Sequence, residues 1–222
     1  TVIAVCALRR VDQVIDTHRS RLIARWLARV AQRRDPRTGL IPHQADATTG
    51  VPVVGARGSS QALLQRFWPI VDPSGSARDY QRFRELFVDS ALGFAGVREY
   101  PKGSNGPADV DSGPLLFGLS PSASAVAIGA ARAGGDAMLA TALMQEADVL
   151  GWPWRAHGKR RYFAGLLPIA DAFLTWARTT PERRGSDQPV AAAWSLYVLL
   201  LWLAMLGASL LMRHRGVRAI VG

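Results

Sequence analysis

The sequence predicts an all-α protein of antiparallel helical hairpins, followed by a C-terminal transmembrane helix. Apolar residues recur with the 3.6-residue period of a helix in six segments between positions 11 and 178. No segment sustains the two-residue alternation of a half-buried strand, and only 51–54 could form a short one. Residues 189–212 carry no charged side chain and match the length of a helix that spans a membrane.

The first three helices are expected at 11–33, 59–71 and 77–92. In the first, an apolar stripe indicates one buried face, formed by Val14, Leu22, Trp26, Leu27 and Val30. The second opens with a pair of serines, a residue type that favours the N-cap position. The third repeats large apolar side chains at helical spacing, namely Tyr80, Phe83, Phe87 and Ala91.

Three more helices are expected at 122–133, 137–150 and 163–178. The first of them is rich in Ala, Val and Ile, which indicates burial on all sides. Long connections alternate with short ones along the chain, in the order 35–58, 72–76, 97–114, 134–136 and 151–162. Because antiparallel hairpins place alternate connections at opposite ends, the three long loops should meet at one end and form one site.

A membrane is the expected location, most simply the bacterial cytoplasmic membrane. The uncharged segment 189–212 contains three large aromatic residues and is followed by an arginine-containing tail at 213–222, a typical membrane anchor. A buried core helix is the alternative, although core helices are usually shorter. Residues 1–10 could be the end of a truncated membrane span, which leaves 11–180 as the folded domain. Arginines follow both apolar segments, so the side of the membrane stays undecided.

The chain is strongly basic, with a formal net charge of +10. Such a balance suggests nucleic acid or an anionic membrane as a partner. Only Lys102 and Lys159 are lysines, the arginines are spread over every segment, and no nucleic-acid-binding motif occurs, so we expect no nucleic-acid partner. Cys6 is the only cysteine, which excludes an internal disulfide and a cysteine-based metal site. No metal or other cofactor is expected.

Asp109 and Asp111 are the first candidates for catalysis. They lie in the loop 97–114, which is rich in Gly and Pro and too charged to be buried without partners. One carboxyl could act as a general acid or base while the charge of the other shifts its pKa, or the two together could bind Mg²⁺ or Ca²⁺. The structural alternative is an Asx turn at Asp109 and a cap at Asp111.

The same loop carries Arg98, Glu99 and Tyr100. Arg98 could anchor a substrate and Glu99 could transfer a proton, or the two could form salt bridges that brace the loop. Tyr100 could hydrogen-bond or stack on a sugar ring, or it could pack under Pro101. His43, in the first long loop, is suited to proton transfer near neutral pH.

The third long loop contains a cationic cluster beside an aromatic residue. Its members are His157, Lys159, Arg160, Tyr162 and Trp154. Such a group could bind the carboxylate or phosphate of a substrate. The alternatives are contact with lipid headgroups beside the membrane span and, for the tryptophan, packing at a helix end.

Three short motifs resemble those of the α/α-toroid, or six-hairpin, superfamily: DPRTGLIPHQ at 35–44, REYP at 98–101 and ADVDSGP at 108–114. In that superfamily, inner and outer helices alternate around a funnel whose broad end carries the site, and membrane proteins related to linalool dehydratase–isomerase are the most similar members. The resemblance covers 11–178 and implies part of an (α/α)6 toroid with His43 beside the site. Ser112 stands where protonating terpene cyclases have the last Asp of their motif, and the catalytic cysteines of the dehydratase have no counterpart.

These features predict a membrane-tethered enzyme that applies acid/base carboxylate chemistry to a carbohydrate or isoprenoid-like small molecule, as a lyase, dehydratase or hydrolase. The alternative is a non-catalytic membrane protein that binds a glycan or a lipid headgroup. The chain lacks the GxGxxG, Walker, HExxH and GxSxG patterns, which excludes a nucleotide hydrolase, a zinc protease and an α/β hydrolase. The sequence gives no indication of the oligomeric state.

Overall fold

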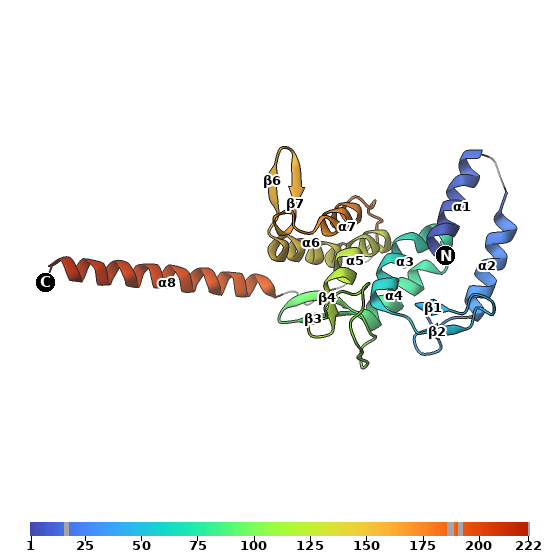
Figure 1. Ribbon diagram of the computed structural model, residues 1–222, viewed down its shortest axis with the longest axis horizontal. Coiled ribbons are helices and arrows are strands. Elements are labelled where there is room, and N and C mark those ends of the chain that lie inside the picture. Colours follow the sequence, from blue (N-terminus) through green and yellow to red (C-terminus); the bar gives the residue numbers. More distant parts are fainter. Residues whose placement is uncertain (16–17, 186–188, 191–192, 222) are drawn as a thin grey trace.

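The computed structural model describes residues 1–15, 18–185, 189–190 and 193–221, although the side chains of Ala156 and of 208–221 are outside the description. The described chain is mostly helical, which confirms the predicted class (Figure 1). The helices are α1 (Val2–Ile15), α2 (Ser20–Gln32), α3 (Gly58–Val71), α4 (Ser76–Phe87), α5 (Pro121–Gly134), α6 (Ala137–Gly151), α7 (Pro168–Arg178) and α8 (Trp194–Val221). A short 3-10 helix, η1 (Phe163–Gly165), precedes α7. The (α/α)6 toroid is not confirmed by this arrangement.

Helix α5 forms the centre of the body and packs against α3, α6 and α7. Its small side chains allow close approach, and Ala127, Ile128 and Ala131 are fully buried. Ser120 caps its N-terminus by accepting a hydrogen bond from the backbone N–H of Ala123, and Pro121 occupies the first turn, where it costs no hydrogen bond. The local sequence therefore fixes where this central helix begins.

Short antiparallel strands connect the helices. The pairs are β1 (Gln44–Ala45) with β2 (Pro52–Val54), β3 (Val88–Ala91) with β4 (Phe94–Arg98), β4 with β5 (Leu119–Ser120), and β6 (Trp154–Ala156) with β7 (Lys159–Arg161). Of these, only β2 matches a strand expected from the sequence. The strands β1, β5, β6 and β7 have only two or three residues, too few to show a clear two-residue alternation, and β3 lies inside the segment expected to be helical at 77–92.

Three predicted helix boundaries are wrong. The helix expected at 11–33 is two helices, α1 and α2, and the side chain of Asp12 accepts a hydrogen bond from the backbone N–H of Arg19 between them. The helix expected at 77–92 ends at Phe87, because the chain continues into β3 and turns back at Gly93, whose φ of +78° suits the turn. The helix expected at 163–178 is interrupted before α7, which starts at Pro168.

The expected membrane segments lie at the two ends of the described chain. Residues 1–10 belong largely to α1, where Val2, Val5 and Cys6 pack in a small core with Trp68 of α3. In the part of the chain that the structure describes, no helix is both long and apolar enough to cross a bilayer. The span expected at 189–212 includes 191–192 and the side chains of 208–212, which lie outside the described residues. That span stays a prediction.

Candidate functional site

Glu99 is at the centre of a polar cluster around the N-terminus of α3. Its side chain is fully buried and accepts hydrogen bonds from the backbone N–H of Ser59, at 3.0 Å, and from the Ser59 hydroxyl, at 2.9 Å. Its backbone carbonyl accepts a third, from the N–H of Gly58 at 2.9 Å. Burial raises the pKa of Glu99, and the hydrogen bonds from Ser59 offset part of that effect. The carboxyl therefore joins the end of β4 to the first turn of α3.

Arg57 connects this cluster to the loop that carries the two aspartates. Its guanidinium forms an ion pair with Asp109, lies 3.9 Å from the Glu99 carboxylate and stacks over the Tyr100 ring with 5.0 Å to its centre. The backbone N–H of Ser112 and the charge of Arg57 lower the pKa of Asp109, so this carboxylate is ionised near neutral pH.

Asp109 organises its own loop. Its Oδ1 accepts hydrogen bonds from the backbone N–H groups of Asp111, at 3.1 Å, and Ser112, at 2.9 Å. This is the Asx turn that the sequence offers as the structural alternative. Asp111 is exposed beside it. Of the two carboxyls predicted to work as a catalytic pair, that of Asp109 therefore holds the loop in its conformation.

His43 reaches the same helix end from the first long loop. Its half-buried imidazole contacts the Ser60 hydroxyl through Nδ1. The structure therefore brings His43, Glu99 and Asp109 to one helix terminus, as expected for loops that meet at one end. Ser60 was missed as a site residue because the serine pair at 59–60 was interpreted only as a helix cap.

Arg98 and Tyr100 are engaged within the protein. Arg98 donates to the side-chain oxygen of Asn105, at 2.9 Å, and to the backbone carbonyl of Ser104, at 3.1 Å. Tyr100 donates its hydroxyl proton to the backbone carbonyl of Pro107, at 2.9 Å. Both side chains brace the polar loop. For Arg98, which also forms an ion pair with Asp89 at 3.4 Å, this is the structural alternative offered by the sequence. For Tyr100 the sequence offered packing under Pro101, and the hydrogen bond to Pro107 is a different contact.

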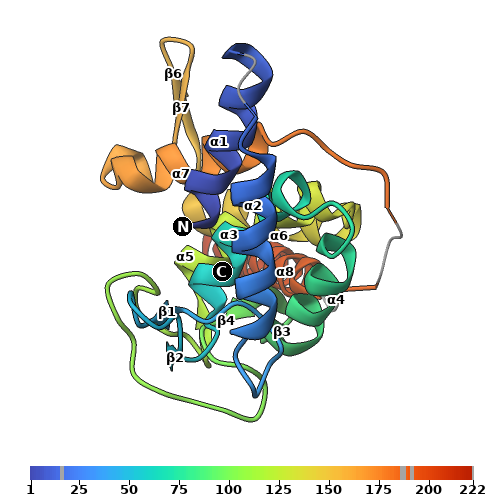
Figure 2. The ribbon, with the colours of Figure 1, turned by 90° about the vertical axis from the view of Figure 1, so that its right-hand side faces the viewer.

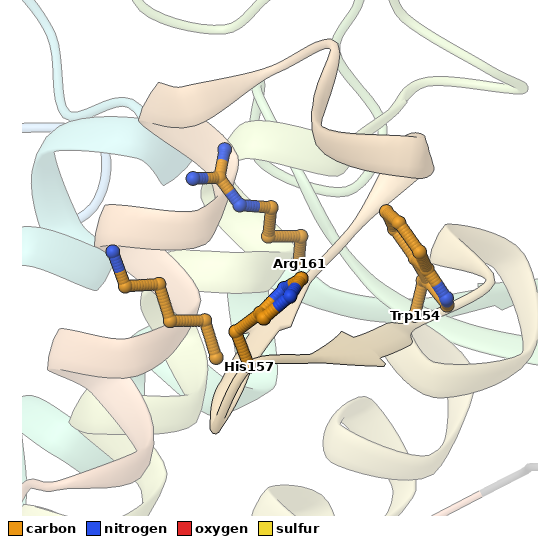
Figure 3. A pocket seen from close by; sticks show the side chains of 4 residues that line it. Trp154, His157 and Arg161 are labelled. Atoms are coloured by element: carbon orange, nitrogen blue, oxygen red, sulfur yellow. The ribbon is translucent and has the colours of Figure 1, made fainter.

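A second polar feature is the β6–β7 hairpin. Trp154 pairs with Arg161 across the strands, and Ala156 pairs with Lys159, so the side chains of Trp154, Lys159 and Arg161 share one face. His157 begins the two-residue turn, with φ of +51° at His157 and +72° at Gly158. A cavity of about 280 Å³ is lined by Trp154, His157, Lys159 and Arg161 (Figure 3). Sequence reasoning missed Arg161, whose role follows only from the cross-strand pairing.

The other two predicted members of the cationic cluster attach the hairpin to the body. Arg160 forms an ion pair with Asp148 of α6 at 2.5 Å, and the buried Tyr162 donates its hydroxyl proton to the same carboxylate at 2.9 Å. Arg178 of α7 adds a hydrogen bond to Asp148 at 2.7 Å. Burial and the bond to Asp148 raise the pKa of Tyr162. These contacts orient the hairpin and leave its opposite face open.

The hairpin and the cluster at α3 lie on opposite sides of the body. The β1–β2 pair and the loop before β5 are on the lower side in both Figures 1 and 2, whereas β6–β7 projects from the upper side. The single site predicted from the three long loops is therefore divided. The reason is that β6–β7 folds as a projecting hairpin held by Asp148, while β4 returns the loop 97–114 to the start of α3.

Comparison of the chain with protein-family models and with curated proteins finds no match. Among the described residues, no group of three or more His, Cys, Asp or Glu side chains could hold a metal ion. The geometry of the two sites therefore gives the indications of function.

Proposed function

We propose that the chain is a non-catalytic membrane-associated protein that binds a phosphate-bearing anion, such as a lipid headgroup, on its β6–β7 hairpin. The observation that carries this proposal is the composition of the hairpin cavity. Its lining combines Lys159, Arg161, His157 and Trp154 and includes no carboxylate. Within the part of the chain described, no hydrogen bond or ion pair engages the side chain of Lys159 or Arg161, whose backbones pair with β6. Two cations and an imidazole around a small cavity match the charge and hydrogen-bonding needs of a phosphate group.

Apolar side chains near the hairpin support a membrane as the source of that ligand. Trp152, Leu166 and Ile169 flank the hairpin in the chain, and each exposes more than half of its surface. In α8, nine large apolar side chains between 196 and 206 are 50–65% exposed, and they lie on all sides of the helix. Exposed apolar surface beside cations is typical of contact with a bilayer, whose interface holds phosphates next to hydrocarbon.

The test compares two substitutions on the same hairpin. Arg161 faces the cavity, whereas Arg155 lies on the opposite face of β6, so Arg161→Gln and Arg155→Gln remove the same charge from different faces. The probes are inorganic phosphate and glycerol phosphate with the detergent-solubilised chain, and phosphatidylcholine vesicles with or without phosphatidylglycerol. We expect Arg161→Gln to weaken binding roughly tenfold and Arg155→Gln to have little effect.

The arms of this experiment separate the two sources of phosphate. Binding to the anionic vesicles without binding to the free phosphates indicates a lipid headgroup, and the reverse result indicates a soluble ligand. Equal losses with the two arginine variants would show that only the overall charge matters, and they would refute the cavity as a binding site.

A second candidate is the acid/base enzyme on a toroid-like scaffold, acting on a carbohydrate or isoprenoid-like substrate. The contact between His43 and Ser60, close to the buried Glu99, favours it, because an imidazole can take the proton of a hydroxyl that it contacts. In such an enzyme, His43→Gln and Asp111→Asn would abolish turnover while leaving substrate binding in place. Unchanged turnover in both variants would remove this candidate.

A further inference from the structure

The start of α8 is tied to the turn between β3 and β4. The backbone N–H groups of Ala193 and Trp194 donate to the carbonyl of Gly93, at 2.7 and 3.1 Å. A Cβ added at Gly93 would lie 2.7 Å from the ring of Tyr197, so α8 and the turn are in close contact. From there α8 extends away from the body, opposite the end that carries α1 and α2 (Figure 1). The β3–β4 turn therefore marks the end of the body from which α8 departs.

That turn presents a large apolar side chain to the outside. Leu92 is 64% exposed and has φ of +51°, in the left-handed region that non-glycine residues rarely adopt. The chain thus holds a leucine in an unfavourable conformation without burying it in the protein. Such a position suggests that the side chain is covered by something outside the chain.

The C-terminus of α6 lies at the same end. The Glu146 carboxylate accepts a hydrogen bond from the backbone N–H of Ala95, 2.7 Å away and two residues beyond Gly93. One turn further along α6, Leu150 is 61% exposed, and Trp152, which follows the helix, is 83% exposed with φ of +41°. A second segment therefore also presents apolar side chains outward, and one of them, Trp152, does so from a left-handed backbone.

We propose that Leu92, Leu150 and Trp152 form a surface that contacts the interfacial region of a lipid bilayer, with the far end of the body pointing away from it. This inference rests on the membrane association proposed above. Tryptophan and leucine side chains favour the boundary between headgroups and hydrocarbon, and α8, whose described side chains are mostly apolar, begins beside the turn that carries Leu92. The cations of the β6–β7 hairpin, which follows Trp152 directly, supply charge complementary to lipid phosphates.

The experiment places a fluorescent label at single cysteines and measures quenching by brominated phosphatidylcholine. Labels are attached to the full chain at Leu92→Cys, Trp152→Cys and, as the matched control, Val14→Cys. Val14 is 82% exposed and apolar too, but it lies at the end of α1, on the part of the body remote from α8 (Figure 1). The native cysteine, Cys6, is buried and should not react in the folded protein.

We expect roughly twofold or stronger quenching at 92 and 152 and little at 14. A second measurement uses the unlabelled protein, in which Trp152→Phe should reduce the quenching of tryptophan emission by the brominated lipid. A vesicle-bound protein whose label at 14 is quenched as strongly as the others would overturn this orientation while leaving membrane association in place.

Other outcomes are equally decisive. Labels at 92 and 152 that are shielded from both brominated lipid and aqueous iodide would indicate a protein partner, such as a second copy of the chain, and would overturn the inference. A protein that does not float with vesicles at all would refute the proposed membrane association as well.

Discussion

Replacing Glu146 by glutamine should change how the stability of the fold depends on pH. Glu146 is a buried residue of α6, only 4% exposed, and its carboxyl accepts a hydrogen bond from the backbone N–H of Ala95 in β4. Burial raises the pKa of Glu146 from 4.5 to about 7, which that hydrogen bond only partly offsets. In the unfolded chain the same group titrates near its ordinary value.

The sign and size of the effect follow from this difference. Between pH 4.5 and about 7, the folded protein holds a proton on Glu146 that the unfolded chain releases, so rising pH favours unfolding. Each pH unit in this interval corresponds to about 1.4 kcal/mol. The free energy of unfolding should therefore fall by about 3 kcal/mol across the interval because of this one residue, and stay level above it.

Urea unfolding of the detergent-solubilised protein at several pH values tests this prediction. Glu146→Gln cannot titrate, so its stability relative to the natural protein should increase from about pH 4.5 to about pH 7. Glu85→Gln is the matched control, because Glu85 is an exposed side chain of α4 with a surface ion pair to Arg82. Parallel pH profiles for the natural protein and Glu146→Gln would refute the reasoning, since they would mean that the carboxyl is ionised within the fold.

Three further substitutions test contacts that position the loops. Asp35→Ala should cost about 3 kcal/mol in urea unfolding, because the buried carboxylate accepts hydrogen bonds from the backbone of Ala56 and from two neighbours, and these outweigh burial and lower its pKa. The natural protein should also lose stability below about pH 4, and this acid loss should be smaller in Asp35→Ala. Gly58→Ala would place a Cβ 1.8 Å from the Arg98 carbonyl and should lower the melting temperature by separating β4 from α3. Asp136→Ala removes the N-cap of α6 and the acceptor for two side chains of α4. The free energy of unfolding, followed by circular dichroism, should fall by about 3 kcal/mol.

The sequence allows the prediction of those helices whose ends carry their own signals. For α5 and α6, Ser120 and Asp136 provide side-chain caps, and Gly135 ends α5 in the left-handed conformation, so the expected ranges agree closely with the structure. For α4 the helical spacing of apolar residues continues past the end of the helix to Ala91. Those last residues instead pair with β4, a non-local contact that no local pattern specifies.

For the candidate site, the sequence predicts which loops carry it but not the contacts that its side chains make. Proline, glycine and charge identify the loop 97–114, and the alternation of long and short connections brings His43 and Glu99 to one helix end. The sequence does not show which residue each charged side chain pairs with in the fold. Arg98 bonds within the loop, and Asp109 bonds to the backbone of its own loop as well as to Arg57, because fixing a long polar segment requires hydrogen bonds and the nearest groups provide them.

These hydrogen bonds and ion pairs determine which charged side chains remain available to bind a ligand. The buried carboxylates of Glu99 and Asp35 satisfy backbone groups that would otherwise be unpaired, so removing them for chemistry would weaken the fold. The face of β6–β7 that carries Lys159 and Arg161 differs, because its cations surround a cavity and their charged groups form no ion pair with another described residue. An anion that entered there would gain charge-assisted hydrogen bonds without breaking existing ones. For this reason the cationic hairpin, more than the carboxylates of the polar loop, is where we expect this protein to act.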